Sequence, residues 1–181
     1  MAELIKGPAH AHRIAAPRVQ AAEDRKQYLA FSSGGETFAM DIRSVREVIQ
    51  YEGLTEIPLM PAFIRGVINL RGSVVPVIDL ARRLGRTLAE VARRTCVVIL
   101  EVPAGGETAV VGILVDSVNE VLDIAPSEID PAPSFSEGPR SELISGVGKV
   151  GGRFVILLDV AHVLSAREME TLADVPGLAE A

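Results

Sequence analysis

The side chains that could perform acid–base or nucleophilic chemistry are few and scattered in this sequence. The histidines are His10, His12 and His162, and the single cysteine is Cys96. A nucleophilic enzyme places its nucleophile beside a base, and a structural zinc site needs four ligands, mostly Cys or His. Neither arrangement can be recognised, and the chain has no GxxxxGK[ST] or GxGxxG phosphate loop. The sequence therefore predicts a binding protein without a catalytic residue, metal or cofactor.

The chain contains two copies of one pattern, which is the sequence sign of a repeated structural unit. Three segments of the first half recur in the same order in the second half: 44–49 at 117–122, 57–63 at 129–135, and 64–84 at 144–164. The copies cover about 27–90 and 91–165. Two units of this size predict two small β-barrels that share an interface.

The repeat identifies Arg71 as a residue that the fold does not require. Arg71 and Gly72 interrupt the nearly apolar run 66–80, and their counterparts in the second copy are Gly151 and Gly152. Gly-Gly is ordinary chemistry for a tight hairpin turn. A solvated turn arginine is the alternative. The comparison with the second copy favours an outward role, as a positive, multi-donor group on a rigid hairpin tip.

Asp79 and Asp159 could be assigned to acid–base work as a carboxylate pair. They hold matching positions in the two copies, and each comes directly before a helical stretch, where Asp is a favoured N-cap. The first stretch is short and ends at Gly85, and the second predicts a C-terminal helix over 159–175. Capping is therefore the better explanation of both residues.

Strand signals dominate the rest of the chain, with β-branched residues in short runs separated by Gly or Pro. In QYLAFSSGGETFAMDI, residues 27–42, apolar residues alternate on both sides of SSGG, which predicts a β-hairpin. Pro76 lies inside the run SVVPVIDL and indicates an edge strand or a bulge. Since the chain has no Trp and only 4% aromatic residues, its core must consist of Val, Ile and Leu. The fold class is therefore all-β.

Charge and hydropathy argue against several classes of partner. The formal net charge of -6 argues against non-specific binding to nucleic acid and against docking on an anionic membrane. No apolar run reaches the roughly 20 residues of a membrane helix, and the N-terminus lacks the apolar stretch of a signal peptide. A single cysteine fits a reducing compartment. We expect a cytoplasmic protein with a disordered tail over 1–26 and a C-terminal helix end and tail over 166–181.

Five segments together resemble the CheW family of chemotaxis coupling proteins. They are YLAFSSGGETFAMDIRSVREVI, IPLMPAFIRGVINLRGSVVPVIDL, VGILVDSVNEVL, IDPAP and RFVILLDV. GVINLRG followed by PVIDL is the most specific part, and the resemblance spans roughly 27–165. It implies two packed, five-stranded barrels like the Src-homology-3 domain. It also implies a non-enzymatic adaptor, expected to be a monomer in solution. Such an adaptor joins the helical hairpin at the cytoplasmic tip of a chemoreceptor to the regulatory domain of the histidine kinase CheA, within receptor arrays.

The resemblance also implies two sets of contact residues. Positions that match the receptor-binding groove are Gly66, Asn69, Arg71 and Cys96. Positions that match the kinase-facing surface of the first barrel are Leu29, Ile42, Val45 and Glu47. The three apolar members of the second set have core packing as their alternative. Ile42 and Val45 are three residues apart, so they share a face of a strand only if a bulge or bend intervenes.

Two other functions remain as alternatives. One is a CheW-like adaptor of a non-flagellar chemosensory pathway. The other is a β-barrel that binds a small ligand or nucleic acid. Binding to single-stranded nucleic acid uses basic grooves and exposed aromatic residues. The ligand- or nucleic-acid-binding barrel is the weaker alternative, because the chain is acidic and has only seven aromatic residues, two Tyr and five Phe.

Overall fold

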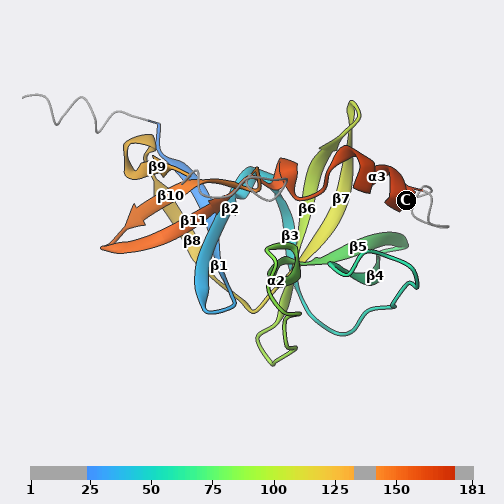
Figure 1. Cartoon of the computed structure of the whole chain (residues 1–181). Helices are drawn as coiled ribbons and strands as arrows, with labels where there is room; N and C mark the ends of the chain where they lie inside the picture. The colour runs from blue at the N-terminus through green and yellow to red at the C-terminus, as the bar shows by residue number, and fades with distance from the viewer. Residues whose placement is uncertain (1–23, 133–141, 174–181) are drawn as a thin grey trace, which may run out of the picture.

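The computed structural model describes residues 24–132 and 142–173 (Figure 1). Most of the predicted N-terminal tail and residues 174–181 lie outside this range. The first copy of the repeat contains β1 (Lys26–Ser33), β2 (Glu36–Asp41), β3 (Val45–Gln50), β4 (Ile64–Leu70) and β5 (Ser73–Asp79). The second contains β6 (Cys96–Ala104), β7 (Glu107–Val115), β8 (Ser117–Ile124), β9 (Ile129–Pro131), β10 (Ile144–Val150) and β11 (Arg153–Leu158). The helical elements are η1 (Ile42–Ser44), α2 (Leu80–Arg83), η2 (Pro126–Glu128), η3 (Val160–His162) and α3 (Ala166–Ala173).

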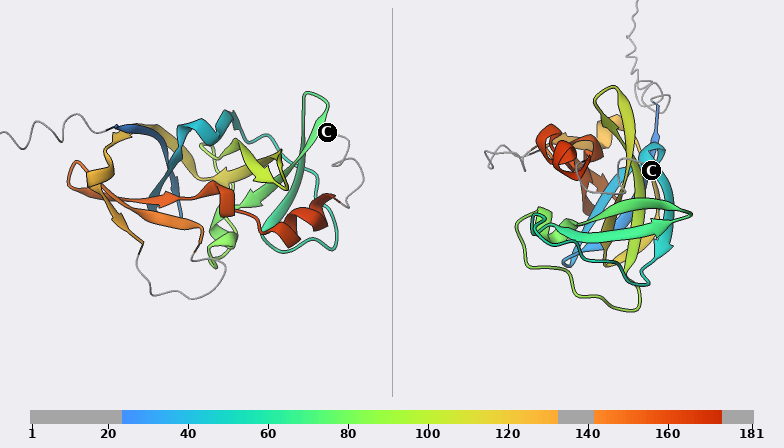
Figure 2. Two further views of the ribbon diagram at one scale, coloured as in Figure 1. Left: turned by 90° about the horizontal axis from the view of Figure 1, so that it is seen from above. Right: turned by 90° about the vertical axis from the view of Figure 1, so that its right-hand side faces the viewer.

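The strands form two sheets, and each sheet takes strands from both copies. Sheet A has the order β8-β1-β2-β11-β10-β9, and sheet B has the order β3-β6-β7-β5-β4. Each sheet thus receives one hairpin, β1–β2 or β6–β7, from the other copy. Strands that are far apart in the sequence therefore lie side by side, as the blue and orange strands at one end show (Figures 1 and 2). The predicted all-β fold of two related units is confirmed.

Each sheet is curled because the chain that leaves one edge strand pairs with the opposite edge. In sheet B, the segment after β3 pairs with β4 through a single bridge between Thr55 and Val67. In sheet A, the segment after β8 forms β9, which pairs with β10. Sheet A therefore has six strands where five were expected, because this closing segment forms three ladder pairs instead of one bridge.

The closing segments explain a pair of matched glycines. A Cβ atom at Gly66 would collide with the carbonyl oxygen of Thr55, and one at Gly146 would lie 2.7 Å from the carbonyl oxygen of Asp130. Since real side chains do not tolerate such approaches, both barrels require glycine at the point where the chain closes over the sheet.

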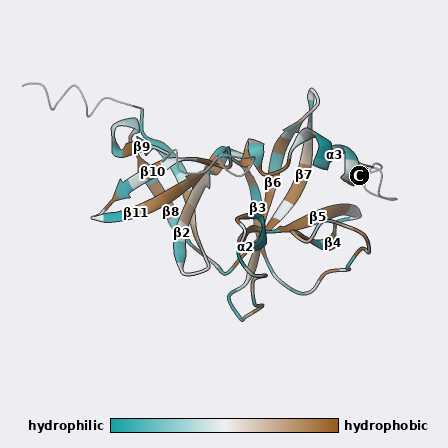
Figure 3. Cartoon of the chain, in the orientation of Figure 1, coloured by the Kyte–Doolittle hydropathy of each residue, from teal (hydrophilic) through white to brown (hydrophobic). Residues whose placement is uncertain are grey.

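Apolar side chains gather in three clusters, one between the sheets and one inside each barrel. Successive residues of β6 point to opposite faces, so Val98 and Leu100 join the central cluster while Val97 and Ile99 join the interior of sheet B. The predicted Val, Ile and Leu core is confirmed, with one stacked aromatic pair, Phe31 and Phe38, in the central cluster. Figure 3 shows this hydrophobic character concentrated on the strands.

The aspartates cap helices as predicted, but the C-terminal helix differs from the prediction. Asp79 accepts a hydrogen bond from the backbone of Arg82 in α2, and Asp159 caps η3 in the same way. The continuous helix predicted over 159–175 is wrong, because η3 ends at His162 and α3 begins only at Ala166. Ser165 and Glu168 cap α3 reciprocally, with Glu168 N donating to Ser165 Oγ at 3.1 Å and Ser165 N donating to Glu168 Oε1 at 2.7 Å. This capping box was readable in the sequence as S-A-R-E.

Candidate partner-binding site

Arg71 occupies a backbone conformation that its counterparts leave to glycine. Among the residues that the structure describes, four two-residue hairpin turns have positive φ at both positions, and their first residues are Gly34, Gly105, Gly151 and Arg71. Arg71 has a φ of 54°, in the left-handed region that costs an L-residue about 1 kcal/mol. The turn is also fixed by Asn69, whose Oδ1 accepts a hydrogen bond from Gly72 N at 2.9 Å. Glycine would adopt this left-handed conformation without strain, so the strain at Arg71 points to a role for the arginine side chain.

The Arg71 side chain forms a two-pronged ion pair with Glu47. Nη1 and Nη2 of Arg71 donate to Oε1 and Oε2 of Glu47, each at 2.9 Å. Arg71 lies in the turn between β4 and β5, and Glu47 lies in β3, so the pair spans the seam between the two edges of sheet B. The Arg71 side chain is 75% exposed while that of Glu47 is 23% exposed. The structure thus joins two residues that the sequence assigned to different surfaces.

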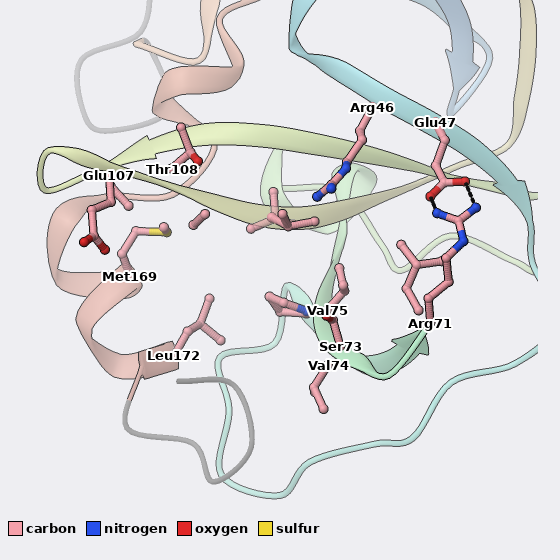
Figure 4. A pocket seen from close by; sticks show the side chains of 16 residues that line it. Arg46, Glu47, Arg71, Ser73, Val74, Val75, Glu107, Thr108, Met169 and Leu172 are labelled. Atoms are coloured by element: carbon pink, nitrogen blue, oxygen red, sulfur yellow. Dashed lines mark hydrogen bonds and ion pairs between the residues drawn. The ribbon is translucent and has the colours of Figure 1, made fainter. Parts of the chain in front are cut away.

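A cleft opens beside this ion pair because β5 and β7 pair along only part of their length. The two strands run parallel and pair at residues 77–79 and 112–114, and they diverge before these positions (Figure 4). We call the space between the diverging ends the β5–β7 cleft. It has a volume of about 630 Å³ and is lined by residues of β5 and β7, by Arg46, Glu47 and Arg71, and by Met169 and Leu172 of α3.

Pro76 lies at the point where β5 begins to diverge from β7. The sequence predicted an edge strand or a bulge here; β5 as a whole is an interior strand of sheet B, but its residues before Val77 have no partner on the β7 side. Pro76 pairs with Val67 of β4 but comes before the residues that pair with β7. This part of β5 therefore has a free edge facing the cleft, and a residue without an N–H is tolerated there.

The other receptor-site candidates lie apart from the cleft. Gly66 is buried beneath Thr55, and Asn69 lines a second groove of about 420 Å³, formed mainly by residues 49–55 and β4. Cys96 is half-buried and packs against the central cluster, on the opposite face of β6 from the Val97 side chain that lines this groove. The structure thus brings Asn69 and Arg71 together on one hairpin and places Cys96 elsewhere.

The apolar kinase-site candidates surround the start of β3. Leu29 is 6% exposed and belongs to the central cluster, whereas Ile42 and Val45 are half-buried and pack against it. The short helix η1 supplies the bend that the spacing of Ile42 and Val45 required. Both of these side chains keep some exposed surface, and Val48 further along the same edge strand is 39% exposed.

An ion pair holds the bend that presents Ile42. Asp41 Oδ1 accepts from Arg43 N at 2.9 Å, and Arg43 Nη2 donates to Asp41 Oδ2 at 2.7 Å. The hydrogen bond from the Arg43 side chain holds the pKa of the Asp41 carboxyl below its usual value. Tyr28 lies close to this pair, and burial raises the pKa of its hydroxyl.

Arg83 was missed by the sequence analysis, although it anchors the C-terminal segment. Its Nε donates to the carbonyl oxygen of Val163 at 3.0 Å, and its Nη1 and Nη2 donate to Glu168 at 3.1 and 2.9 Å. The guanidinium also lies 4.5 Å from the centre of the Phe63 ring. The side chain is only 12% exposed, so it links α2, the 51–63 loop and α3 in a largely buried position. A single Arg in a short helix carries no sequence signal for such a role.

The described residues show no site for a metal ion, and no helix among them suits a membrane. Within residues 24–132 and 142–173, no three His, Cys, Asp or Glu side chains are grouped as metal ligands. His10 and His12 lie outside these residues. None of the described helices is both long and apolar enough to cross a bilayer.

Comparisons with known proteins give a consistent answer. The family model of the CheW-like domain matches residues 27–168. Chemotaxis protein CheW of Klebsiella aerogenes is 37% identical over 150 residues, covering 83% of this chain and 88% of that protein. CheW of Rhizobium meliloti is 33% identical, covering 80% and 91%, and Protein FrzA of Myxococcus xanthus is 29% identical, covering 88% and 99%. The crystal structure of the scaffolding protein TtCheW from Thermoanaerobacter tengcongensis superposes with a TM-score of 0.71 at 31% identity, covering 81% of this chain and 98% of that one.

Two intertwined β-barrels with a charged hairpin tip beside a cleft place this chain in the structural class of the scaffolding protein TtCheW. The chain belongs to the CheW-like domain family, and its function is that of an adaptor in chemotaxis signal transduction.

Proposed function

We propose that this chain couples a chemoreceptor to a CheA-type histidine kinase by binding both at once. The receptor contributes the helical hairpin of its cytoplasmic tip, and the kinase contributes its regulatory domain. Holding the two together raises the effective concentration of each for the other, and lets the state of the receptor bias the activity of the kinase. The chain itself converts no substrate in this proposal and acts in the cytoplasm.

The observation that carries the receptor side is the strained, exposed Arg71. Its guanidinium stands on a rigid turn at the mouth of a cleft, and Asn69 fixes that turn. Arg71 is 75% exposed even though both ends of its guanidinium are bound by Glu47. We assign Arg71 and Asn69 to direct contact with the receptor. We assign supporting roles to Gly66, which allows the barrel to close, and to Cys96, which packs against the central cluster.

The kinase side rests on the half-buried apolar surface at the start of β3. Ile42 and Val45 present part of their side chains there, and Leu29 supports them from the core. Glu47 borders both surfaces through its pairing with Arg71. Exposed apolar side chains on an edge strand are a typical place for another protein to dock.

Calorimetry with the isolated regulatory domain of the kinase from the same organism tests the kinase side. We expect wild-type chain to bind and Ile42→Glu to lose at least tenfold in affinity, because a charge would be buried without a partner in the interface. Leu88→Glu is the matched control, since Leu88 is 50% exposed in the 84–95 loop and should bind as the wild type does. Absence of binding by the wild type at high concentration would remove the kinase from the proposal.

Binding to a soluble receptor hairpin fragment tests the receptor side. Arg71→Glu should abolish the interaction, because it replaces the exposed donor with a like charge beside Glu47. Arg153→Glu is the matched control, because Arg153 is exposed at the equivalent hairpin of the other barrel. Equal loss with both substitutions would indicate a non-specific charge effect and count against the site.

The pathway that the adaptor serves has a second candidate. The chain resembles proteins named CheW and also Protein FrzA, so an adaptor of a non-flagellar chemosensory pathway is the alternative. Deleting the gene and comparing swimming in soft agar with movement on surfaces separates the two. Loss of swimming alone supports the flagellar pathway.

A further inference from the structure

The β5–β7 cleft is lined by two strand edges that lack sheet partners at their diverging ends. Residues 73–76 of β5 pair only with β4, and residues 107–111 of β7 pair only with β6. The cleft floor is apolar, since Val75 and Val111 are each 1% exposed. A gap of this kind between two strands is covered in folded proteins by a packed element.

The element that covers the cleft in this chain is α3. Met169 and Leu172, three residues apart on the helix, point from α3 into the space beside Val75 (Figure 4). Among the α3 side chains that the structure describes, only Leu172 is buried, at 7% exposed. Polar attachment comes from Glu168, which accepts from Arg83 and from Ser165 N. Buried Leu172, half-buried Met169 and the Arg83–Glu168 ion pair therefore carry the attachment of the described part of α3.

Helix α3 depends on this attachment for its stability. Most of the stability of a helix in a protein comes from the packing of its apolar face rather than from intrinsic propensity, and this holds for the described part of α3, Ala166–Ala173. Its helical state and its docking are therefore coupled, so α3 exchanges between docked and undocked states more readily than the strands do.

The docked helix leaves much of the cleft open. About 630 Å³ remains, and its other end is bordered by the Arg71–Glu47 pair and by Arg46, which is 53% exposed and lies 3.7 Å from Glu101. The present occupant also shows what the cleft accepts: two apolar side chains three residues apart on one helix, Met169 and Leu172. A longer amphipathic helix with this pattern, and with acidic groups near Arg46 and Arg71, would fill the cleft more completely than α3 does.

We infer that the β5–β7 cleft is a helix-binding groove that α3 occupies in the free chain, and that a helix of the receptor hairpin displaces α3 when it binds. This inference rests on the proposed function, because the receptor hairpin is the helical partner named there. It adds that α3 is a built-in competitor for the same groove. The apparent affinity for the receptor is then lowered by the fraction of chains in which α3 is docked.

Hydrogen exchange of the full chain, with and without a soluble receptor hairpin fragment, tests the inference together with binding affinity. We expect exchange in residues 166–173 to accelerate on binding, while the central strands stay protected. Leu172→Ser should raise the affinity about tenfold, the change expected if α3 occupies the cleft nine-tenths of the time. Glu170→Ser is the matched control, because Glu170 is exposed on the same helix and should leave the affinity unchanged. Glu168→Gln releases α3 without altering the core and should also tighten binding.

Each outcome decides a different point. Faster exchange of α3 together with tighter binding of the fragment by Leu172→Ser supports the inference. The inference is also supported if Leu172→Ser binds the fragment while the wild type shows no binding. If the wild type binds the fragment while exchange in α3 stays the same or slows, and the variants bind no more tightly, α3 is not a competitor and the proposed function stands. If no variant and no wild-type chain binds the fragment, the receptor proposal and the inference fail together.

Discussion

Arg71 combines an unfavourable backbone with a favourable side-chain contact. Its left-handed conformation costs about 1 kcal/mol. An exposed ion pair such as the one with Glu47 returns only about 0–1 kcal/mol. The fold therefore gains little from this arginine, and the three equivalent turns use glycine. What the arginine provides is a planar donor group held in a fixed place, which suits recognition of a carboxylate on a partner.

Replacing Arg71 with glycine should separate stability from binding. We expect Arg71→Gly to keep the free energy of unfolding within about 1 kcal/mol of the wild type, because relief of the left-handed strain offsets the lost ion pair. The same variant should lose the receptor fragment. Urea unfolding and calorimetry measure the two quantities, and a large loss of stability would show that the arginine is a structural residue.

Asp41 should make stability depend on pH in a defined direction. The pKa of its carboxyl is lowered in the folded chain by Arg43, so its contribution is present above the unfolded pKa of about 3.9 and is lost as the pH falls through the folded pKa. Wild type should therefore be more stable than Asp41→Asn at pH 6, and the difference should shrink toward pH 3. Urea unfolding across this range measures it. In an Arg43→Gln background the pH dependence should largely disappear, and its persistence would implicate another group.

At the scale of elements, one side chain ties the C-terminal segment to the first barrel. Arg83 reaches Val163, Glu168 and the Phe63 ring from α2. We expect Arg83→Met to lower the free energy of unfolding by about 2 kcal/mol, through the lost cation–π contact and charge-assisted hydrogen bonds. Exchange in α3 should rise more than in the strands. Arg82→Met is the control, since Arg82 is exposed on the same helix, and an equal effect there would count against the anchor.

Gly66 is the element-scale test of barrel closure. A Cβ atom at this position would meet the backbone of Thr55, so Gly66→Ala should cost about 2 kcal/mol or more and break the paired hydrogen bonds between Thr55 and Val67. Amide exchange at these two residues reports the break directly. In Gly148→Ala the new methyl finds its nearest neighbour at 3.5 Å, so this control should be tolerated.

Local sequence patterns predicted much of the fold. Features that depend on how distant strands pair could not be predicted from them. The hairpin of 27–42, the Asp caps and the two-unit architecture could be read from alternation, capping chemistry and the internal repeat. The helix over 159–175 was extended too far because its apolar spacing outweighed the capping signal at Ser165. Pro76 indicated a free strand edge, which the structure has at this point, but the sequence could not show that this edge belongs to an interior strand, because strand order in the sheet is not a local property.

The candidate site was harder to predict than the fold, because its geometry depends on contacts between distant segments. The sequence singled out Arg71 through the repeat, yet nothing local indicated that Glu47, 24 positions away, would bind it. Likewise, Arg83 meets Glu168 across 85 positions of sequence. Such pairs appear only once the sheets have closed.

At the scale of the whole molecule, neither copy of the repeat can complete a barrel alone. β1 and β2 lie in a sheet whose other strands come from the second copy, and β6 and β7 lie in a sheet completed by the first. Fragments 1–90 and 91–181 should therefore be unfolded as monomers, and mixing them should restore the native circular dichroism spectrum. Sedimentation distinguishes the states, and a folded monomer of either fragment would contradict the expectation.

Because each hairpin, β1–β2 or β6–β7, lies in the sheet of the other copy, the two barrels form one rigid body. The parallel joins β2–β11 and β5–β7 tie each barrel to chain that belongs to the other copy, and the central cluster fills the space between them. A hinge between the barrels would have to open the central cluster, which packs buried side chains of both sheets together. If the proposed function holds, two proteins bound to this rigid body keep their relative orientation, and a movement of one turns the whole body and with it the other. An adaptor of this kind sets the geometry of any lattice into which it is built.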